Sequence, residues 1–226
     1  QYTKNVLIRE YGIPDQKIHV VHNSMEVSDD IDESQNLHHY LQVMKSHGYK
    51  VVVNIGRKTI QKGLTHLLES ARLVVEKNPK VLFVLAGGGE QEEELISLAA
   101  AYGISKNVIS IGWINGKSLR DTYKIGDVFV MPSVSEPFGL TALEAIGFGV
   151  PVVISHQTGV AEVLQNAFKV DFWDTHQMAD MILGLCENDS LAQTMWQNSY
   201  DEYKKQSWQK SVDTMHHRYK QTVGTP

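Results

Sequence analysis

The sequence has little of several features that mark specialised classes of protein. A single cysteine, Cys186, in 226 residues excludes a framework of internal disulfides and fits a reducing compartment, so we expect a cytoplasmic protein. No apolar run reaches the roughly 18 residues of a membrane-spanning helix. The net charge is −5 and no basic run occurs, which argues against nucleic acid as a main partner.

Patterns that bind metals or activate nucleophiles are also missing. Ten histidines are present, but pairs such as His38-His39 point to different helix faces, and no His-x3-His occurs. The sequence lacks a Walker phosphate loop and a Gly-x-Ser-x-Gly elbow. Cys186 ends an apolar run at 182–186 and is interpreted as a small buried hydrophobe. We therefore expect neither a metal nor a bound cofactor.

From Val51 onward, apolar runs alternate with glycine-containing loops and amphipathic segments. The runs are continuously apolar, as expected of parallel strands covered on both faces. Strands are expected at 51–55, 81–86, 107–111, 127–131, 151–155 and 167–170. Helices are expected at 63–77, 91–102, 117–124, 140–147, 160–165, 176–188, 190–205 and 208–222. This alternation predicts an α/β fold: a single Rossmann-like domain with a mostly parallel sheet and a helical C-terminal tail.

The amino-terminal part of the chain is less regular. A short helix pattern ends at Gly12, and a brief strand is expected at 18–21. The acidic stretch 29–33 is interpreted as a solvated loop, and helical spacing resumes at 37–44. The predicted division is a junction segment, a Rossmann-like core and a helical tail, at 1–50, 51–175 and 176–226.

The stretch Ser135–Glu144, SEPFGLTALE, carries the clearest functional pattern. It follows an apolar strand that ends at Pro132 and continues into a helix pattern. This unit builds parallel sheets that bind ligands at the carboxyl ends of their strands. The start of the helix offers backbone N–H groups where a phosphate binds favourably. These groups belong to Gly139, Leu140 and Thr141.

Two carboxylates lie on either side of this phosphate position. Glu136 precedes it in the loop, and Glu144 lies about one turn inside the helix. One carboxylate is suited to hydroxyls of a sugar and the other to hydroxyls of a ribose. The pattern therefore indicates a nucleotide-sugar site.

A second pattern, GRKTIQKG, spans Gly56–Gly63 directly after a predicted strand. Gly56 permits a tight turn, and Arg57 and Lys62 flank the loop. A diphosphate leaving group carries about two negative charges, which a metal or paired cations must neutralise. The alternative is that Arg57, Lys58 and Lys62 are solvated loop charges. The loop alone does not decide between them, and the acidic motif downstream favours the functional interpretation.

Other features give weaker signals. Gly87–Gly89 lets the backbone approach a ligand, although many strand-to-helix turns look similar. Glu92–Glu94 are expected on the surface at a helix start. Glu162 is either a helix-start carboxylate or a ligand contact. His22, at a strand end, is not favoured as a ligand contact.

The loop 112–116 also follows a predicted strand. It is a candidate for holding a nucleobase through its backbone, which includes Ile114. Trp113 in the same loop is interpreted as a packing residue.

Together these motifs resemble the carboxyl-terminal, donor-binding domain of the retaining glycosyltransferases of family 4, which have the GT-B fold. The resemblance runs from about Val21 to Val170. It rests on the Glu-x7-Glu pair within SEPFGLTALEAIGFGVPVV, on GRKTIQKG and on TGVAEVL. It implies a metal-independent transfer of a hexosyl group from a nucleoside diphosphate sugar to an acceptor sugar or another hydroxyl compound. It also implies that the acceptor-binding N-terminal domain lies outside this chain and that the isolated domain is inactive.

The resemblance assigns roles to individual residues. Arg57 and Lys62 would bind the donor diphosphate, Glu136 the transferred sugar and Glu144 the ribose. Arg57, Lys62 and Glu136 would also act in catalysis. The remaining donor contacts would come from Gly56, Ile114, Phe138, Gly139, Leu140 and Thr141.

The chain departs from the family pattern at two places. Asn23-Ser24-Met25-Glu26 stands where the family often has Asn-Gly-x-Asp, and Thr158-Gly159 stands where it often has Gly-Gly. The second departure leaves the donor sugar undefined. The competing interpretations are a non-catalytic nucleotide-sugar-binding module and a GT-B-type epimerase. A phosphorylase would need a pyridoxal-phosphate lysine, for which no convincing candidate is found.

Overall fold

The computed structural model describes residues 1–22, 36–206 and 208–223. Its core is a six-stranded sheet in which all strand pairs between described residues run parallel. The strands are β1 (Lys50–Ile55), β2 (Val81–Ala86), β3 (Val108–Ile111), β4 (Val128–Met131), β5 (Val152–Ser155) and β6 (Phe168–Val170). Each of the six predicted strands of the core is present, so the predicted α/β class is confirmed.

The strand order β3-β2-β1-β4-β5-β6 reverses between β1 and β4. From β1 the sheet grows through β2 to β3 on one side, and from β4 through β5 to β6 on the other. In sheets of this order, ligands bind outside the carboxyl ends of the strands at the reversal. The loop 56–63 follows β1 and the loop 132–139 follows β4. The two strongest motifs of the sequence therefore meet at the position where this topology binds ligands.

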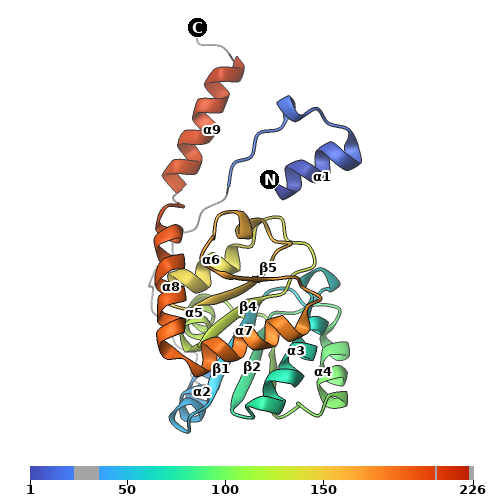
Figure 1. Ribbon diagram of the computed structural model, residues 1–226, viewed down its shortest axis with the longest axis vertical. Helices are drawn as coiled ribbons and strands as arrows, with labels where there is room; N and C mark the ends of the chain where they lie inside the picture. Colours follow the sequence, from blue (N-terminus) through green and yellow to red (C-terminus); the bar gives the residue numbers. More distant parts are fainter. Residues whose placement is uncertain (23–35, 207, 224–226) are drawn as a thin grey trace.

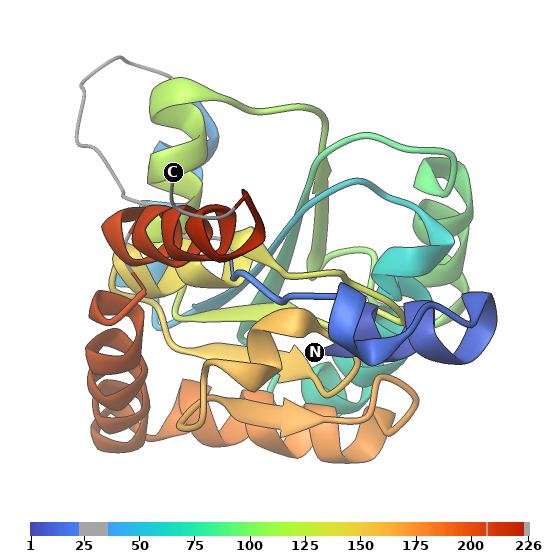
Figure 2. The ribbon, with the colours of Figure 1, turned by 90° about the horizontal axis from the view of Figure 1, so that it is seen from above.

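Helices cover both faces of the sheet (Figure 2). Side chains of α3, α4 and α7 pack on one face with Val52, and those of α2, α5 and α6 pack on the other with Val51 and Val53. Alternate strand residues enter two separate cores, which explains why the strands read as continuous apolar runs. The α-helices among the described residues are α1 (Tyr2–Tyr11), α2 (Asn36–Ser46), α3 (Leu64–Lys77), α4 (Glu92–Ala101), α5 (Gly116–Ile125), α6 (Leu140–Gly147), α7 (Thr175–Glu187), α8 (Asp189–Lys204) and α9 (Trp208–Val223).

Helices from the predicted junction and tail also take part in the core. Leu41 of α2 is buried against the sheet, and α7 packs along α3. α8 packs on α6, where the indole N–H of Trp196 donates a hydrogen bond to the Ile146 carbonyl oxygen at 2.9 Å. Figure 1 shows α1 and α9 at one end of the molecule, beyond the helices that cover the sheet.

Two predicted elements differ from the structure. The strand expected at 18–21 is wrong, because Ile18 is extended but the segment pairs with no described strand. The helix expected at 160–165 is a short 3-10 helix, Gly159–Glu162. Its start is held by the neighbouring loop, since the Val160 N–H donates to the Phe138 carbonyl oxygen at 2.6 Å. The acidic stretch 29–33 lies outside the described residues.

Candidate functional site

The loop after β1 is joined to the loop after β4. The Val134 N–H donates a hydrogen bond to the Gln61 carbonyl oxygen at 2.9 Å. Gly63 has a φ of +64°, and a Cβ there would lie 2.1 Å from the Pro132 carbonyl oxygen. Only glycine allows this close approach with positive φ. Backbone contacts therefore hold the basic motif beside the acidic one.

Lys62 and Glu136 meet where these loops join. The Lys62 ammonium donates a short hydrogen bond to Glu136 Oε2, and the side chains are only 23% and 15% exposed. The stem of Lys62 passes over Gly56, where a Cβ would lie 3.8 Å from the lysine Cε. Arg57, on the same loop, is exposed. The structure thus brings together a cation and a carboxylate that were predicted in separate motifs.

Glu136 is also held through its backbone. It forms an isolated parallel bridge with Thr158, and the Gly159 N–H donates to the Glu136 carbonyl oxygen at 2.9 Å. A Cβ at Gly159 would lie 2.1 Å from the Pro137 carbonyl oxygen. The loop that follows β5 therefore also supports the Glu136 loop, through backbone contacts.

Helix α6 starts next to this pair. Gly139 is its N-cap with a φ of +106°, and a Cβ there would lie 2.6 Å from Met131 Cε. The first N–H groups of a helix have no acceptor inside it, and the helix dipole makes this end positive. Leu140 and Thr141 present such groups, while Phe138 before them is half-buried. The predicted phosphate position thus has the expected backbone geometry.

Glu144 is oriented by a residue that the sequence analysis missed. The Tyr123 hydroxyl donates a short hydrogen bond to Glu144 Oε2. Tyr123 is 1% exposed, and its ring stacks on Phe148 with centroids 5.4 Å apart. Burial, and then the charge of Glu144, raise the pKa of the Tyr123 phenol, so it remains a donor. In the sequence, the helical spacing of Tyr123 from Leu119 indicates a core residue, but it does not reveal Glu144 as the partner of the hydroxyl.

The loop after β3 differs from the prediction at one residue, Trp113. Ile114 is half-buried, as a residue between strand and helix often is. Trp113, which was interpreted as a packing residue, is 80% exposed. A Cβ at Gly88 would lie 3.3 Å from its Cδ1, so the indole lies against a turn made of glycines. Those glycines have no side chains that could cover it.

Lys58 also differs from what the sequence predicted, because neither of the two roles considered for the charges of its loop applies to it. It is neither a solvated loop charge nor a cation of the open site, because its side chain is fully buried. Its ammonium lies 2.6 Å from Glu92 Oε2, although Glu92 was expected on the surface. No signal in the local sequence distinguishes Lys58 from Arg57 beside it.

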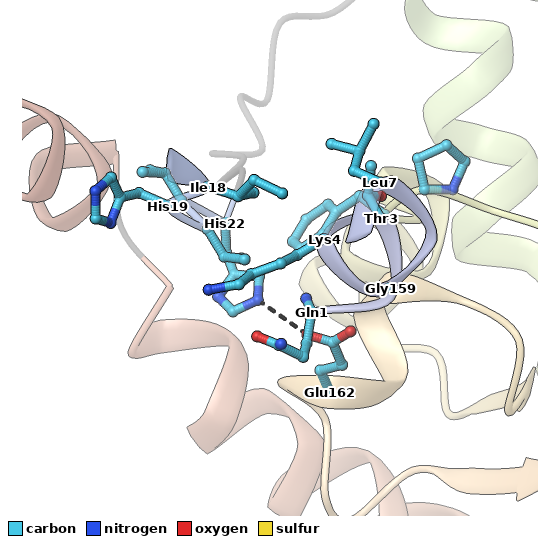
Figure 3. Close-up of a pocket in the computed structure, with 13 residues that line it drawn as sticks. Gln1, Thr3, Lys4, Leu7, Ile18, His19, His22, Gly159 and Glu162 are labelled. Atoms are coloured by element: carbon cyan, nitrogen blue, oxygen red, sulfur yellow. Dashed lines mark hydrogen bonds and ion pairs between the residues drawn. The ribbon is translucent and has the colours of Figure 1, made fainter. Parts of the chain in front are cut away.

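A cavity of about 300 Å³ lies beside the Glu136 loop (Figure 3). Its walls include Lys4 and His22 from the amino-terminal segment and Phe138, Gly159 and Glu162 from the domain core. His22 Nε2 lies 3.4 Å from Glu162 Oε2, and the imidazole stacks on Phe138 with centroids 6.0 Å apart. This volume is at the lower end of the range of ligand pockets, about 300–1,000 Å³.

Other classes of site were considered across the same part of the chain. Within the described residues, no group of three or more His, Cys, Asp or Glu side chains is arranged to hold a metal ion. No described helix is both long and apolar enough to cross a bilayer. Cys186 in α7 is buried, and burial raises the pKa of its thiol to about 12. It is therefore a packing residue, as expected.

Comparison with known proteins gives a consistent family. The model of the family described as Glycosyl transferases group 1 matches residues 41–202. An uncharacterised glycosyltransferase of Methanocaldococcus jannaschii is 32% identical over 161 residues, which cover 69% of this chain and 40% of that protein. Mannosylfructose-phosphate synthase of Agrobacterium fabrum is 27% identical over 185 residues, which cover 78% of this chain and 41% of that protein. The chain therefore spans less than half the length of these relatives.

Solved structures agree on the fold. The C-terminal domain of a glycosyl transferase group 1 family protein from Francisella tularensis has a TM-score of 0.65 at 24% identity, covering 76% of this chain and 93% of that one. A mutant of S. aureus TarM in complex with ligands that include UDP has a TM-score of 0.77 at 20% identity, covering 96% of this chain and 42% of that one. At these identities the likeness concerns the fold.

Proposed function

Because the chain belongs to the family of group 1 glycosyl transferases, we propose that it forms the donor-binding half of a retaining hexosyltransferase. The donor is a nucleoside diphosphate sugar, and the acceptor is a hydroxyl group of a sugar or another compound. One observation carries this proposal: Lys62 and Glu136 pair beside the first turn of α6, where the strand order reverses.

The diphosphate of the donor lies between the loop after β1 and the start of α6 in this proposal. The exposed Arg57 and the partly buried Lys62 supply positive charge there. The N–H groups of Leu140 and Thr141 supply further donors. An ammonium group has three N–H donors, so Lys62 can keep its bond to Glu136 and still reach a phosphate oxygen. These groups neutralise the charge that develops on the leaving diphosphate.

The two carboxylates bind the two ends of the donor. Glu144 lies four residues into α6, about 6 Å along the axis at 1.5 Å per residue, and binds the ribose hydroxyls. Its hydrogen bond from Tyr123 keeps it in one orientation. Glu136 binds hydroxyls of the transferred sugar, with Oε2 already engaged by Lys62. The cavity walled by Phe138 and Gly159 is also lined by Pro137, the residue directly after Glu136.

Transfer with retention needs no protein nucleophile in this arrangement. The bond between the sugar and the diphosphate breaks as the acceptor hydroxyl approaches the same face of the sugar. The leaving phosphate oxygen takes the proton of that hydroxyl. Arg57 and Lys62 stabilise the departing charge, and Glu136 holds the sugar in position. The acceptor would be held by a domain beyond residues 1–226, since relatives are more than twice as long as the matched part.

The test is a calorimetric titration of the 226-residue chain with uridine, adenosine and guanosine diphosphates and their hexose conjugates. At least one diphosphate should bind, and Arg57→Gln should weaken it about tenfold, which corresponds to about 1.4 kcal/mol. Arg72→Gln is the matched control, since Arg72 lies on α3, where it pairs with Glu76 of the same helix at 3.8 Å and lies over the Tyr102 ring, 5.8 Å from its centroid. It should change the affinity by less than about twofold. If no diphosphate binds, or if both variants weaken binding equally, the proposal is wrong.

Metal independence is part of the same proposal and gives a first prediction. Because the two cations, Arg57 and Lys62, and the start of α6 neutralise the diphosphate, no divalent ion is needed. Adding a chelator should leave the affinity for the diphosphate within about twofold. A tenfold loss would mean that the phosphate position is misassigned.

A further inference from the structure

Lys58 is an unusual residue for the interior of a small domain, because lysine is rarely fully buried. Its side chain is 0% exposed. The ammonium group donates hydrogen bonds to Glu92 Oε2 at 2.6 Å, to Ser110 Oγ at 2.6 Å and to the Ile111 carbonyl oxygen at 3.0 Å. An ammonium group has three N–H donors, so these three acceptors use them all.

This satisfied network separates Lys58 from the other cations of the loop. A buried charge is tolerated only when it is paired and fully hydrogen-bonded, which Lys58 is. With no donor left over, it has none to offer a ligand. Any effect of Lys58 on ligand binding must therefore act through the groups that it holds in place.

Those groups come from the ends of three adjacent strands. Lys58 follows β1, Glu92 is the first residue of the helix after β2, and Ser110 and Ile111 end β3. The order β3-β2-β1 makes these strands neighbours. The Ser110 hydroxyl also donates a short hydrogen bond to Glu92 Oε1. The side chain of Lys58 thus ties the phosphate loop to the strand end from which the loop with Ile114 continues.

The backbone of Lys58 connects the phosphate loop to the glycine turn after β2. Its N–H donates to the Gly88 carbonyl oxygen at 2.9 Å, and its carbonyl oxygen accepts from the Gln91 N–H at 3.1 Å. A Cβ at Gly89 would lie 2.3 Å from that carbonyl oxygen, so the glycine turn rests directly on Lys58. The Gly87 N–H in turn donates to the Ile111 carbonyl oxygen at 3.1 Å.

The ion pair is electrostatically favourable. Burial raises the pKa of Glu92, but hydrogen bonds from Lys58 and Ser110 and the charge of Lys58 outweigh this effect. The net pKa of Glu92 lies below its ordinary value, so the carboxylate is charged at neutral pH.

We propose that Lys58 is a positioning residue that holds the phosphate loop, with Arg57 and Lys62, at a fixed place relative to the loop 112–115. The proposal rests on the proposed function, in which the loop after β1 binds the donor diphosphate, and it takes the loop after β3, a candidate from the sequence, as the one that holds the base of the same donor. When the network is intact, one ligand can engage both loops without reordering either of them. Without it, each loop can still form, but their spacing is no longer set.

The test uses three variants and one control in the 226-residue chain. Lys58→Met keeps the aliphatic stem and removes the ammonium group. Glu92→Gln removes the partner charge, and the double variant removes both. Lys77→Met is the matched control, because Lys77 pairs with Asp180 at 2.9 Å on the surface, where the side chains are 61% and 68% exposed.

Each variant is examined for stability in urea, for hydrogen exchange of the amides at 58, 87 and 91, and for affinity for the nucleoside diphosphate that the unmodified chain binds best. Lys58→Met should lower stability, because it leaves the Glu92 carboxylate without its cation. The double variant should recover much of that stability, since neither charge is then left unpaired. In both variants exchange at the three amides should accelerate and affinity should fall about tenfold. Binding is measured under conditions in which the urea unfolding curves show that every variant is folded.

Whether Lys58 is a positioning residue is decided by the double variant, in which stability should recover while affinity stays low. A purely structural ion pair would let the double variant regain both, and that result would overturn the proposal. Faster exchange with unchanged affinity would also overturn it. If the unmodified chain binds none of the three diphosphates, the proposed function fails, and the exchange rates alone decide whether Lys58 sets the loop spacing. If the chain binds and Lys58→Met binds equally well, only the role of Lys58 is wrong.

Discussion

At the scale of single residues, the site depends on partners that lie far apart in the sequence. Lys62 contacts Glu136, and Tyr123 contacts Glu144. In each pair a carboxylate receives a hydrogen bond in a partly or fully buried place, where such bonds are stronger than in water. The orientation of both carboxylates is therefore set before a ligand arrives.

The two carboxylates should differ in what they recognise. Glu144→Gln should weaken binding of the bare nucleoside diphosphate and of its sugar conjugate alike, by about 1–3 kcal/mol for a lost charged hydrogen bond. Glu136→Gln should leave binding of the bare diphosphate nearly unchanged, because Lys62 has further N–H donors for the phosphate, and should reduce only the extra affinity that the sugar provides. Calorimetry with both ligands measures this. Equal losses for the bare diphosphate would show that the carboxylates do not divide ribose from sugar.

The hydroxyl of Tyr123 should matter for stability and for binding. Tyr123→Phe leaves the ring packed on Phe148 but removes the hydrogen bond to Glu144, so stability should fall by about 1–2 kcal/mol in urea unfolding. Affinity for the diphosphate should fall as well, because Glu144 loses its fixed orientation. Tyr102→Phe is the control, since Tyr102 packs against the opposite face of the sheet. Equal effects of the two variants would contradict this role for Tyr123.

At the scale of secondary-structure elements, the position of a helix decides how reactive its side chains are. α7 packs beside α3 on one face of the sheet and buries Cys186. The same thiol on an exposed helix face would titrate near its ordinary pKa. Its inertness is thus a property of the packing of α7.

The thiol of Cys186 should be unreactive in the folded protein. Burial raises its pKa to about 12, so almost no thiolate exists at about pH 8 and the sulfur is also shielded from reagents. Alkylation at that pH should proceed only as fast as the chain unfolds, and it should become fast in urea. Cys186→Ala gives the background of the assay. Rapid labelling without denaturant would show that α7 opens locally.

At the scale of the whole molecule, the direction of the strands brings the loops of the candidate site together. The loops after β1, β3 and β4 and the start of α6 lie at the same end of one parallel sheet, since all described strand pairs run in the same direction. In the proposed function, these loops bind the nucleotide and the first sugar. A second body must supply the other wall of the cleft if a sugar is to be transferred and not only bound.

The 226-residue chain should therefore bind a nucleoside diphosphate and fail to transfer sugar. Transfer requires an acceptor held in line with the donor and a site closed to water. The measurement compares this piece with a longer protein that contains it, using the same donor and a panel of sugar acceptors. Robust transfer by residues 1–226 alone would contradict the proposal that the acceptor half lies elsewhere.

Much of the fold could be predicted from sequence because its signals are local. Continuous apolar runs bounded by glycine loops predicted the six core strands, and the pattern of Leu140, Leu143 and Ile146 predicted α6 with the bounds it has in the structure. The segment 18–21 shows the limit of such signals. Three apolar residues and a histidine suffice for a strand pattern, but a strand also needs a neighbouring strand with free backbone groups, and the local sequence does not reveal whether one is present.

Residue types at fixed spacing were enough to predict the class of fold, the family and the two motifs that meet at the site. The roles of the individual charges depend on partners that are distant in the sequence, so they became visible only in the folded chain. Arg57 and Lys58 are adjacent cations, yet one is exposed at the site and the other is fully buried against Glu92. The difference arises because the partners of Lys58 lie after β2 and at the end of β3, two strands that only folding brings beside β1.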